Sequence, residues 1–208
     1  MTRTLKIRKL TEGNPEEIAR LYEICLHTGA DGQDASGIFH DRKLLGELYV
    51  GAYARFHPEL AFVLVDQDDT IQGYAVGVSD SIAFDNLLDR HWWPWLRARY
   101  PAASPLVIHP KDADLVNALH NWSGTDHAIA AQYPAHLHID LLPSAQGGGN
   151  GKRLLLTLLD ALKEAGATGV HLGVSASNKQ ARGFYEHLGF TVLSRGNNAI
   201  LMAMKFNM

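Results

Sequence analysis

The stretch that most constrains the fold is LLPSAQGGGNGKRLLLTLL, residues 141–159, where glycines lie directly before a leucine-rich helix. Glycine loses more backbone freedom on folding than other residues, and cations in the first turns of a helix oppose its macrodipole. Lys152 and Arg153 stand in those first turns. Because glycines leave N–H groups uncovered at a helix N-terminus, such a segment forms an anion site. We expect a strand, a phosphate-binding loop and a helix; the alternative is a flexible loop that binds nothing.

Two common phosphate-binding patterns do not fit this loop. A Walker loop needs Ser or Thr after Gly-Lys, but Gly151-Lys152 is followed by Arg153. The dinucleotide pattern needs a third glycine where Lys152 stands, counting from Gly147 and Gly149. The ligand is therefore expected to be a different diphosphate.

Composition excludes several classes of protein. The 208 residues suit one domain, which we place at 1–208, and a net charge of −3 offers no basic stripe for nucleic acid. No apolar run reaches the roughly 20 residues of a membrane span, and the N-terminus has no secretory apolar region. The single Cys25 excludes an intrachain disulfide, so we expect an inert packed thiol in a cytoplasmic protein. Monomer and homodimer both remain open.

Hydrophobic periodicity and turn residues divide the chain into alternating elements. Strands are expected at 4–10, 60–66, 71–80, 136–142, 169–175, 190–195 and 198–206. Helices are expected from Asn14, at 41–56, at 85–100, at 151–165 and within 177–190. The tryptophan-rich helix at 85–100 and an irregular segment to about Tyr133 form an insertion before the fourth strand. This order predicts a mixed α/β sheet.

The loop and the following helix also resemble a known family. Residues 146–151, QGGGNG, match the Gln/Arg-x-x-Gly-x-Gly/Ala signature of the GCN5-related N-acetyltransferases, called GNAT proteins. A second landmark, 178–190, holds Asn178, Phe184-Tyr185-Glu186 and Leu188-Gly189-Phe190 in the family order. The resemblance covers about 136–195 and implies one twisted, mostly antiparallel sheet flanked by helices.

A narrower resemblance covers most of the chain. Residues 24–53, the Trp92-Trp93 segment and 136–143 are similar to the acetyltransferase-like domain of animal O-GlcNAcase and its stand-alone bacterial relatives. The animal domain has an altered coenzyme A site. Intact Gln146, Gly149 and Gly151 favour a cofactor-binding bacterial form here.

The family resemblance implies acetyl-CoA as cosubstrate and assigns a role to each matching residue. Backbone groups of Leu141 and Leu142 would pair with pantetheine, and an N–H there would polarise the thioester carbonyl. Asn178 would bond the pantetheine arm, and Tyr185 would protonate the departing thiolate, although it could instead be a core tyrosine. The pyrophosphate and its approach would be held by Gln146, Gly147, Gly148, Gly149, Asn150, Gly151 and Lys152.

A general base is harder to assign. His136, His138 and Asp140 alternate along a strand and so share one face. Histidine beside a carboxylate is suited to accept a proton near neutral pH, so His138 and Asp140 are the catalytic candidates. The same residues could form a buried polar layer or hydrogen-bond the acceptor. A zinc site at the His-x-His pair lacks further ligands in the sequence, and we expect no metal.

The acceptor side rests on one loop. Asp31, Gln33 and Asp34 follow the first helix, where this fold usually shapes its acceptor groove, and carboxylates there suit a cationic amine. The alternative is a solvated turn. Together these features predict an acetyl-CoA-dependent N-acetyltransferase with a small-molecule or peptide amine as acceptor. A catalytically silent module that binds acetyl-CoA or a protein is the competing hypothesis.

Overall fold

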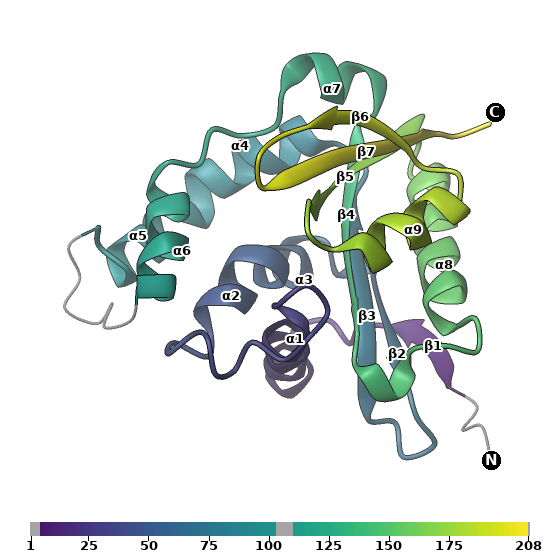
Figure 1. Cartoon of the computed structure of the whole chain (residues 1–208), viewed down its shortest axis with the longest axis horizontal. Helices are drawn as coiled ribbons and strands as arrows, with labels where there is room; N and C mark the ends of the chain where they lie inside the picture. Colours follow the sequence, from purple (N-terminus) through teal and green to yellow (C-terminus); the bar gives the residue numbers. More distant parts are fainter. Residues whose placement is uncertain (1–4, 103–109, 208) are drawn as a thin grey trace.

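A seven-stranded sheet forms the centre of the computed structural model, which describes residues 5–102 and 110–207 (Figure 1). The strand order is β1-β2-β3-β4-β5-β7-β6, and every neighbouring pair is antiparallel except β4 and β5. The strands are β1 (Lys6–Lys9), β2 (Ala61–Val65), β3 (Ile71–Val78), β4 (Ala135–Leu141), β5 (Gly169–Ser175), β6 (Thr191–Arg195) and β7 (Ala199–Lys205). All seven expected strands are confirmed; Thr4, at the start of the first expected range, lies outside the described residues.

Helices cover both faces of the sheet (Figure 1). One face packs against α1 (Pro15–Thr28) and the helices before β4; the other packs against α8 (Asn150–Glu164) and α9 (Lys179–His187). Alternate residues of β2 serve the two cores, with Val63 on the α1 side and Leu64 on the α8 side. The remaining helices are α2 (Leu44–Gly46), the π-helix η1 (Glu47–Gly51), α3 (Ala52–Phe56), α4 (Ser81–His91), α5 (Trp93–Arg99), α6 (Pro110–His120) and α7 (His127–Gln132), with short 3-10 turns η2 (Pro58–Leu60) and η3 (Pro143–Ala145).

Helix α8 holds the glycine loop against the sheet. Its apolar stripe is fully buried, and Gly166, with a φ of 89°, ends the helix as predicted. Burial of one leucine side chain stabilises the fold by about 1.5–3 kcal/mol, so the five together fix the start of the helix firmly in place. The stripe consists of Leu154, Leu155, Leu158, Leu159 and Leu162.

Three helical expectations need correction. The helix expected at 41–56 begins at Leu44, because the Asp41 side chain accepts hydrogen bonds from the Lys43 and Leu44 N–H groups, and it contains a π turn. The helix expected at 85–100 is two helices that meet at Trp92, since Pro94 cannot donate an interior hydrogen bond. The segment up to Tyr133 is not irregular: it contains α6 and α7, while residues 103–109 lie outside the described part.

Among the described residues, no helix combines the length and the apolar character that crossing a bilayer requires.

Candidate active site

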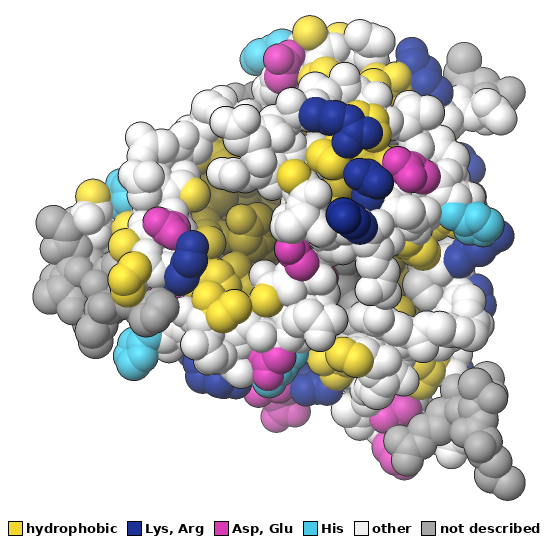
Figure 2. Space-filling view, in the orientation of Figure 1, with side chains coloured by type: hydrophobic (Ala, Val, Ile, Leu, Met, Phe, Trp, Pro, Cys, Tyr) yellow, Lys and Arg dark blue, Asp and Glu magenta, His cyan; other side chains and the backbone are white. Residues whose placement is uncertain are grey.

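A cavity of about 710 Å³ opens where β4 and β5 separate. The two strands pair only through Ala135↔Val170 and His136↔His171, and beyond that point both continue without each other. The cavity passes between them and is lined from both faces of the sheet. Figure 2 shows a hollow on this face of the molecule with mostly hydrophobic walls.

Backbone groups of β4 face this gap. The Leu142 N–H donates to the Gln72 carbonyl on the β3 side at 3.0 Å. In a strand, the backbone N–H groups of successive residues point to opposite neighbouring strands. Because the Leu142 N–H points to β3, the N–H groups of Leu141 and Ile139 point toward the gap on the β5 side. The Gln146 Nε2 group donates to the Leu141 carbonyl on that side at 3.1 Å. Leu142 itself is turned away and does not line the cavity, so its predicted contact with pantetheine is not supported.

The glycine loop lies at one end of the cavity. Gly147, Gly148 and Gly149 have φ angles of 80°, 58° and 78°, which only glycine adopts at no steric cost. A Cβ atom added at Gly147 or Gly149 would meet no atom within 4 Å, so the space above the loop is open. Within the described part of the chain, the N–H groups of Gly151 and Lys152 have no hydrogen-bond acceptor. These donors lie at the start of α8, where the sequence predicts an anion site, and that site stays a prediction.

The two cationic residues in the first turns of α8 have different roles. Lys152 lines the cavity. Arg153 instead donates from Nη2 to the Leu5 carbonyl and from Nη1 to the Asn150 Oδ1 atom, each at 3.3 Å. Arg153 thus links α8 to the residue before β1. These hydrogen bonds account for a cation near the N-terminus of the helix without a bound anion.

Asn178 and Tyr185 both line the cavity from the α9 side. The Asn178 Oδ1 atom caps α9 by accepting from the Ala181 N–H at 2.9 Å, and no group in the described part of the chain bonds its Nδ2 atom. Tyr185 is buried between Phe184 and Phe190, with ring centroids 5.4 and 5.5 Å away. Burial, with a smaller contribution from the Asp140 charge, raises the pKa of Tyr185, so its hydroxyl stays protonated.

On the opposite face of the sheet, His138 and Asp140 form a close pair. The His138 Nε2 atom lies 3.0 Å from Asp140 Oδ2, and the Tyr74 hydroxyl donates to the same oxygen at 2.6 Å. Tyr74 reaches Asp140 because the two residues are partners in the β3–β4 register. The Tyr49 ring stacks on the His138 ring at 5.8 Å between centroids.

This pairing changes the expected chemistry of the histidine. Burial by itself would lower the pKa of His138, but the charge and hydrogen bond of Asp140 raise it to about 10. At neutral pH the imidazole is therefore protonated, and it accepts a proton only after losing its own on the alkaline side. The expectation of a proton acceptor near neutral pH is corrected accordingly.

His136 points to the same face but has a structural role. Its Nδ1 atom lies 2.7 Å from the Ser81 hydroxyl, and its ring packs against Tyr53 and Phe84. Burial lowers the pKa of His136 to about 3, so it is neutral in the folded protein. Among the described residues, the one group of three with metal-binding atoms close together is Cys25, His138 and Asp140, within 4.8 Å of one another. That no metal binds stays a prediction.

The acceptor loop is only partly at the cavity. Asp31 lines it and accepts a hydrogen bond from the Ser177 hydroxyl at 2.6 Å, which links the loop to the start of α9. Gln33 and Asp34 do not line it: Asp34 is exposed and bonded to His27 at 3.1 Å and to the Ser36 N–H at 2.8 Å. The predicted substrate-binding role of Gln33 and Asp34 is therefore not supported.

Most predicted site residues are brought together here, and several unpredicted ones join them. Among the predicted residues, only Leu142, Gly148, Gln33 and Asp34 do not line the cavity. The sequence did not predict the part of the cavity wall that is formed by residues preceding β4 in the chain. No sequence pattern shows that these helices pack beside the far end of a later strand. Its residues include Cys25, Phe39, Leu45, Tyr49 and Leu115.

Comparison with known proteins identifies the family of this chain. Residues 32–190 match the model of the acetyltransferase (GNAT) family. The crystal structure of SsHAT shares 32% identity, covers 97% of this chain and 98% of that one, and superposes with a TM-score of 0.86. The PaiA N-acetyltransferase of Thermoplasma acidophilum, solved with coenzyme A, has 17% identity, a TM-score of 0.55 and coverage of 98% and 99%, which shows the same fold.

A curated relative matches along most of the chain. Protein O-GlcNAcase of Rattus norvegicus is 25% identical over 191 residues, which are 91% of this chain and 20% of that protein. The chain thus spans about a fifth of the length of the curated relatives that it first matches.

Proposed function

The chain belongs to the acetyltransferase (GNAT) family, and from this premise we propose that it transfers the acetyl group of acetyl-CoA to a primary amine of a small molecule or peptide. One observation carries the proposal: the cavity crosses the sheet between β4 and β5, with the glycine loop on one face of the sheet and the His138–Asp140 pair on the other. Two substrates can enter such a cavity from opposite faces and meet at the gap.

The residues of the loop and of β4 fit the donor. The free N–H groups of Gly151 and Lys152, with the Lys152 ammonium, suit a diphosphate. The N–H groups of Ile139 and Leu141 point into the gap, where a donor to the developing oxyanion contributes several kcal/mol in acyl transfer. Asn178 Nδ2 is positioned to bond an amide of the pantetheine arm. Acetyl-CoA supplies the activated thioester.

Tyr185 suits the departing sulfur. Because burial raises the pKa of its hydroxyl, Tyr185 is a neutral hydrogen-bond donor throughout the physiological range. An ordinary thiol has a pKa of about 8.5. Tyr185 therefore stabilises the departing thiolate by donating a hydrogen bond while it keeps its own proton. The sulfur leaves as a thiol by taking the proton that the amine nitrogen loses after it has attacked the thioester carbonyl.

The His138–Asp140 pair suits the acceptor. No described group bonds the Asp140 Oδ1 atom, which is available to hold the substrate ammonium. An alkylammonium has a pKa of about 10.4. Because the pKa of His138 is about 10, a proton passes from the ammonium to the neutral imidazole at little cost in free energy. Transfer is therefore expected to quicken as the pH rises from 7 to 10.

The test is an acceptor-dependent thiol-release assay with acetyl-CoA, with the acetylated amine identified by mass spectrometry. Thiol release that requires an amine supports the enzyme. Binding of acetyl-CoA without release, across a broad panel of amines and pH values, would favour the catalytically silent module. A cytoplasmic setting, a bacterial source and the monomer or homodimer state remain predictions.

A further inference from the structure

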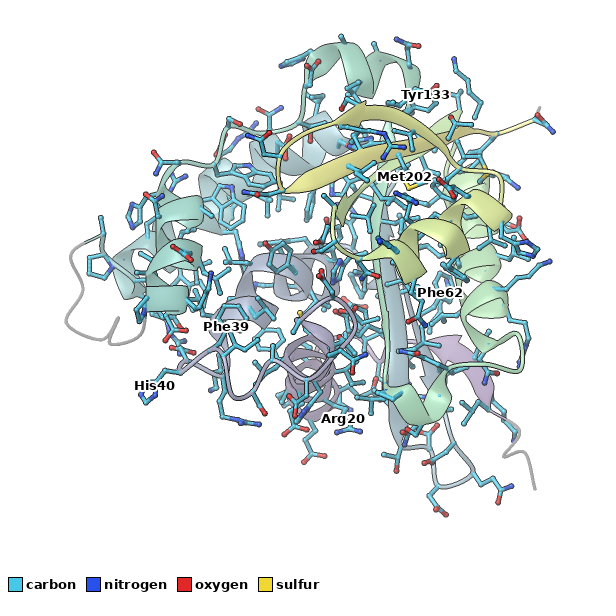
Figure 3. The ribbon with its side chains drawn as sticks, in the orientation of Figure 1. Arg20, Phe39, His40, Phe62, Tyr133 and Met202 are labelled. Carbon is cyan, nitrogen blue, oxygen red and sulfur yellow. The ribbon has the colours of Figure 1, made fainter. Side chains whose placement is uncertain are left out.

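The half of the cavity on the α1 face is built mainly from apolar side chains. Figure 2 shows these hydrophobic walls, and Figure 3 labels Phe39 beside α2. Resting on the proposed function, we infer that the acceptor is a primary amine with an apolar body, preferably aromatic, rather than a polyamine or a lysyl peptide. The apolar wall of the acceptor half consists of Phe39, Leu45, Tyr49 and Leu115.

Three polar residues of this half offer little to a polar ligand. The Thr28 hydroxyl donates to the Ile24 carbonyl at 2.7 Å. Asp31 accepts from the Ser177 hydroxyl at 2.6 Å. Cys25 is buried, and burial raises the pKa of its thiol, so it presents no charge. Against Phe39, Leu45 and Leu115 a polar acceptor body would lose its hydration without gaining hydrogen bonds, which is costly, whereas an apolar body would not.

The amino end of such a molecule has a defined place. Asp140 uses Oδ2 for His138 and Tyr74, and no described side chain bonds Oδ1. Beside it, the Tyr49 ring stacks on His138 with an interplanar angle of 23°, and Tyr49 is 45% exposed. The uncovered face of Tyr49 can hold an aromatic ring by stacking, or an ammonium by a cation–π contact. An ammonium held by Asp140 next to this apolar wall favours an amphipathic monoamine.

The π-helix η1 presents Tyr49 to the cavity. Its wider turn holds Glu47 inside, where the carboxylate accepts from the Tyr22 hydroxyl at 2.9 Å, while Tyr49, two residues on, faces the cavity. The Trp92 Nε1 group donates to the Glu47 carbonyl at 3.1 Å and fixes the same turn. Short π turns of this kind occur frequently at functional sites.

The experiment compares kcat/KM for three probes: 2-phenylethylamine, spermidine and a lysine-containing peptide. The test variant is Phe39→Gln, because Phe39 is only half-buried and its loss should leave the fold intact. Leu156→Gln, on the exposed side of α8 and away from the cavity, is the matched control. Melting temperatures verify folding, and calorimetric titration of acetyl-CoA verifies the donor site in each protein.

We expect phenylethylamine to exceed both other probes by at least about tenfold, the scale of burying one phenyl group. Phe39→Gln should reduce this preference mainly through KM, and Leu156→Gln should preserve it. Equal or better use of spermidine or the peptide, or a preference unchanged in Phe39→Gln, overturns the inference but leaves amine acetylation standing. Acetyl-CoA binding without thiol release from any probe counts against the proposed function itself, and the inference falls with it.

Discussion

Replacing Asp140 by Asn tests the electrostatic core of the site. The substitution keeps the size of the side chain and an oxygen for the Tyr74 hydroxyl, but it removes the charge beside His138. Without that charge, burial should dominate and the pKa of His138 should fall from about 10 to below 6.5. The change therefore isolates one interaction.

The size of the effect follows from the shift. Moving the pKa from 6.5 to about 10 corresponds to ~5 kcal/mol at 1.36 kcal/mol per unit. The His138 side chain is 31% exposed, and solvent screening reduces this to about 2–3 kcal/mol. Because the folded-state pKa is raised, the stabilisation is fully present below pH 6.5 and is lost as the pH rises to about 10.

Two measurements address this prediction. Histidine ring protons titrated by NMR, with His138→Gln for assignment, should place the wild-type pKa near 10 and that of Asp140→Asn below 6.5. Urea unfolding at several pH values should show a wild-type advantage over Asp140→Asn that is largest near pH 6 and shrinks toward pH 10. A wild-type pKa near 6.5, or an advantage independent of pH, would refute the reasoning.

Three further predictions concern other residues. Tyr185→Phe should lower kcat by about 10–100-fold with little change in the affinity for acetyl-CoA; an unchanged kcat in steady-state assays would remove Tyr185 from the chemistry. Because burial lowers the pKa of His136 to about 3, its contribution to stability is present above pH 6.5 and lost as the pH falls toward 3. His136→Gln should therefore lose less stability than wild type between pH 7.5 and 4.5 in guanidinium unfolding, and parallel losses would contradict this. The Asn14 side chain accepts from two N–H groups at the start of α1, so Asn14→Ala should lower the free energy of unfolding by about 1 kcal/mol in urea titrations. An unchanged free energy of unfolding would show that this cap contributes nothing to stability.

The strands and the donor half of the site could be predicted because their signals are local. Two short apolar runs joined by a polar turn define β2 and β3, and the run of glycines before α8 predicts its own ligand class. Asn14 and Gly166 mark helix ends through backbone rules that involve few neighbours. Each of these features depends on a short run of neighbouring residues in the chain.

The acceptor half could not be predicted in the same way. Tyr74 meets Asp140 only through the β3–β4 register, and Cys25 approaches the pair from α1. The π turn at η1, which presents Tyr49 to the cavity, has no sequence signature that separates it from an α-helix. The protonated state of His138 depends on the balance of burial against one carboxylate at 3.0 Å, and that distance is set by tertiary packing.

Calorimetric titration of acetyl-CoA into wild type, Gly149→Trp and Gly166→Trp tests the central claim most directly. Both glycines have positive φ and open space around them, at opposite ends of α8, so the two variants carry similar backbone strain. The account predicts binding to wild type and Gly166→Trp, and its loss in Gly149→Trp, whose indole fills the space above the loop. Undisturbed binding to Gly149→Trp, or no binding to wild type, would contradict the assignment of the glycine loop to acetyl-CoA.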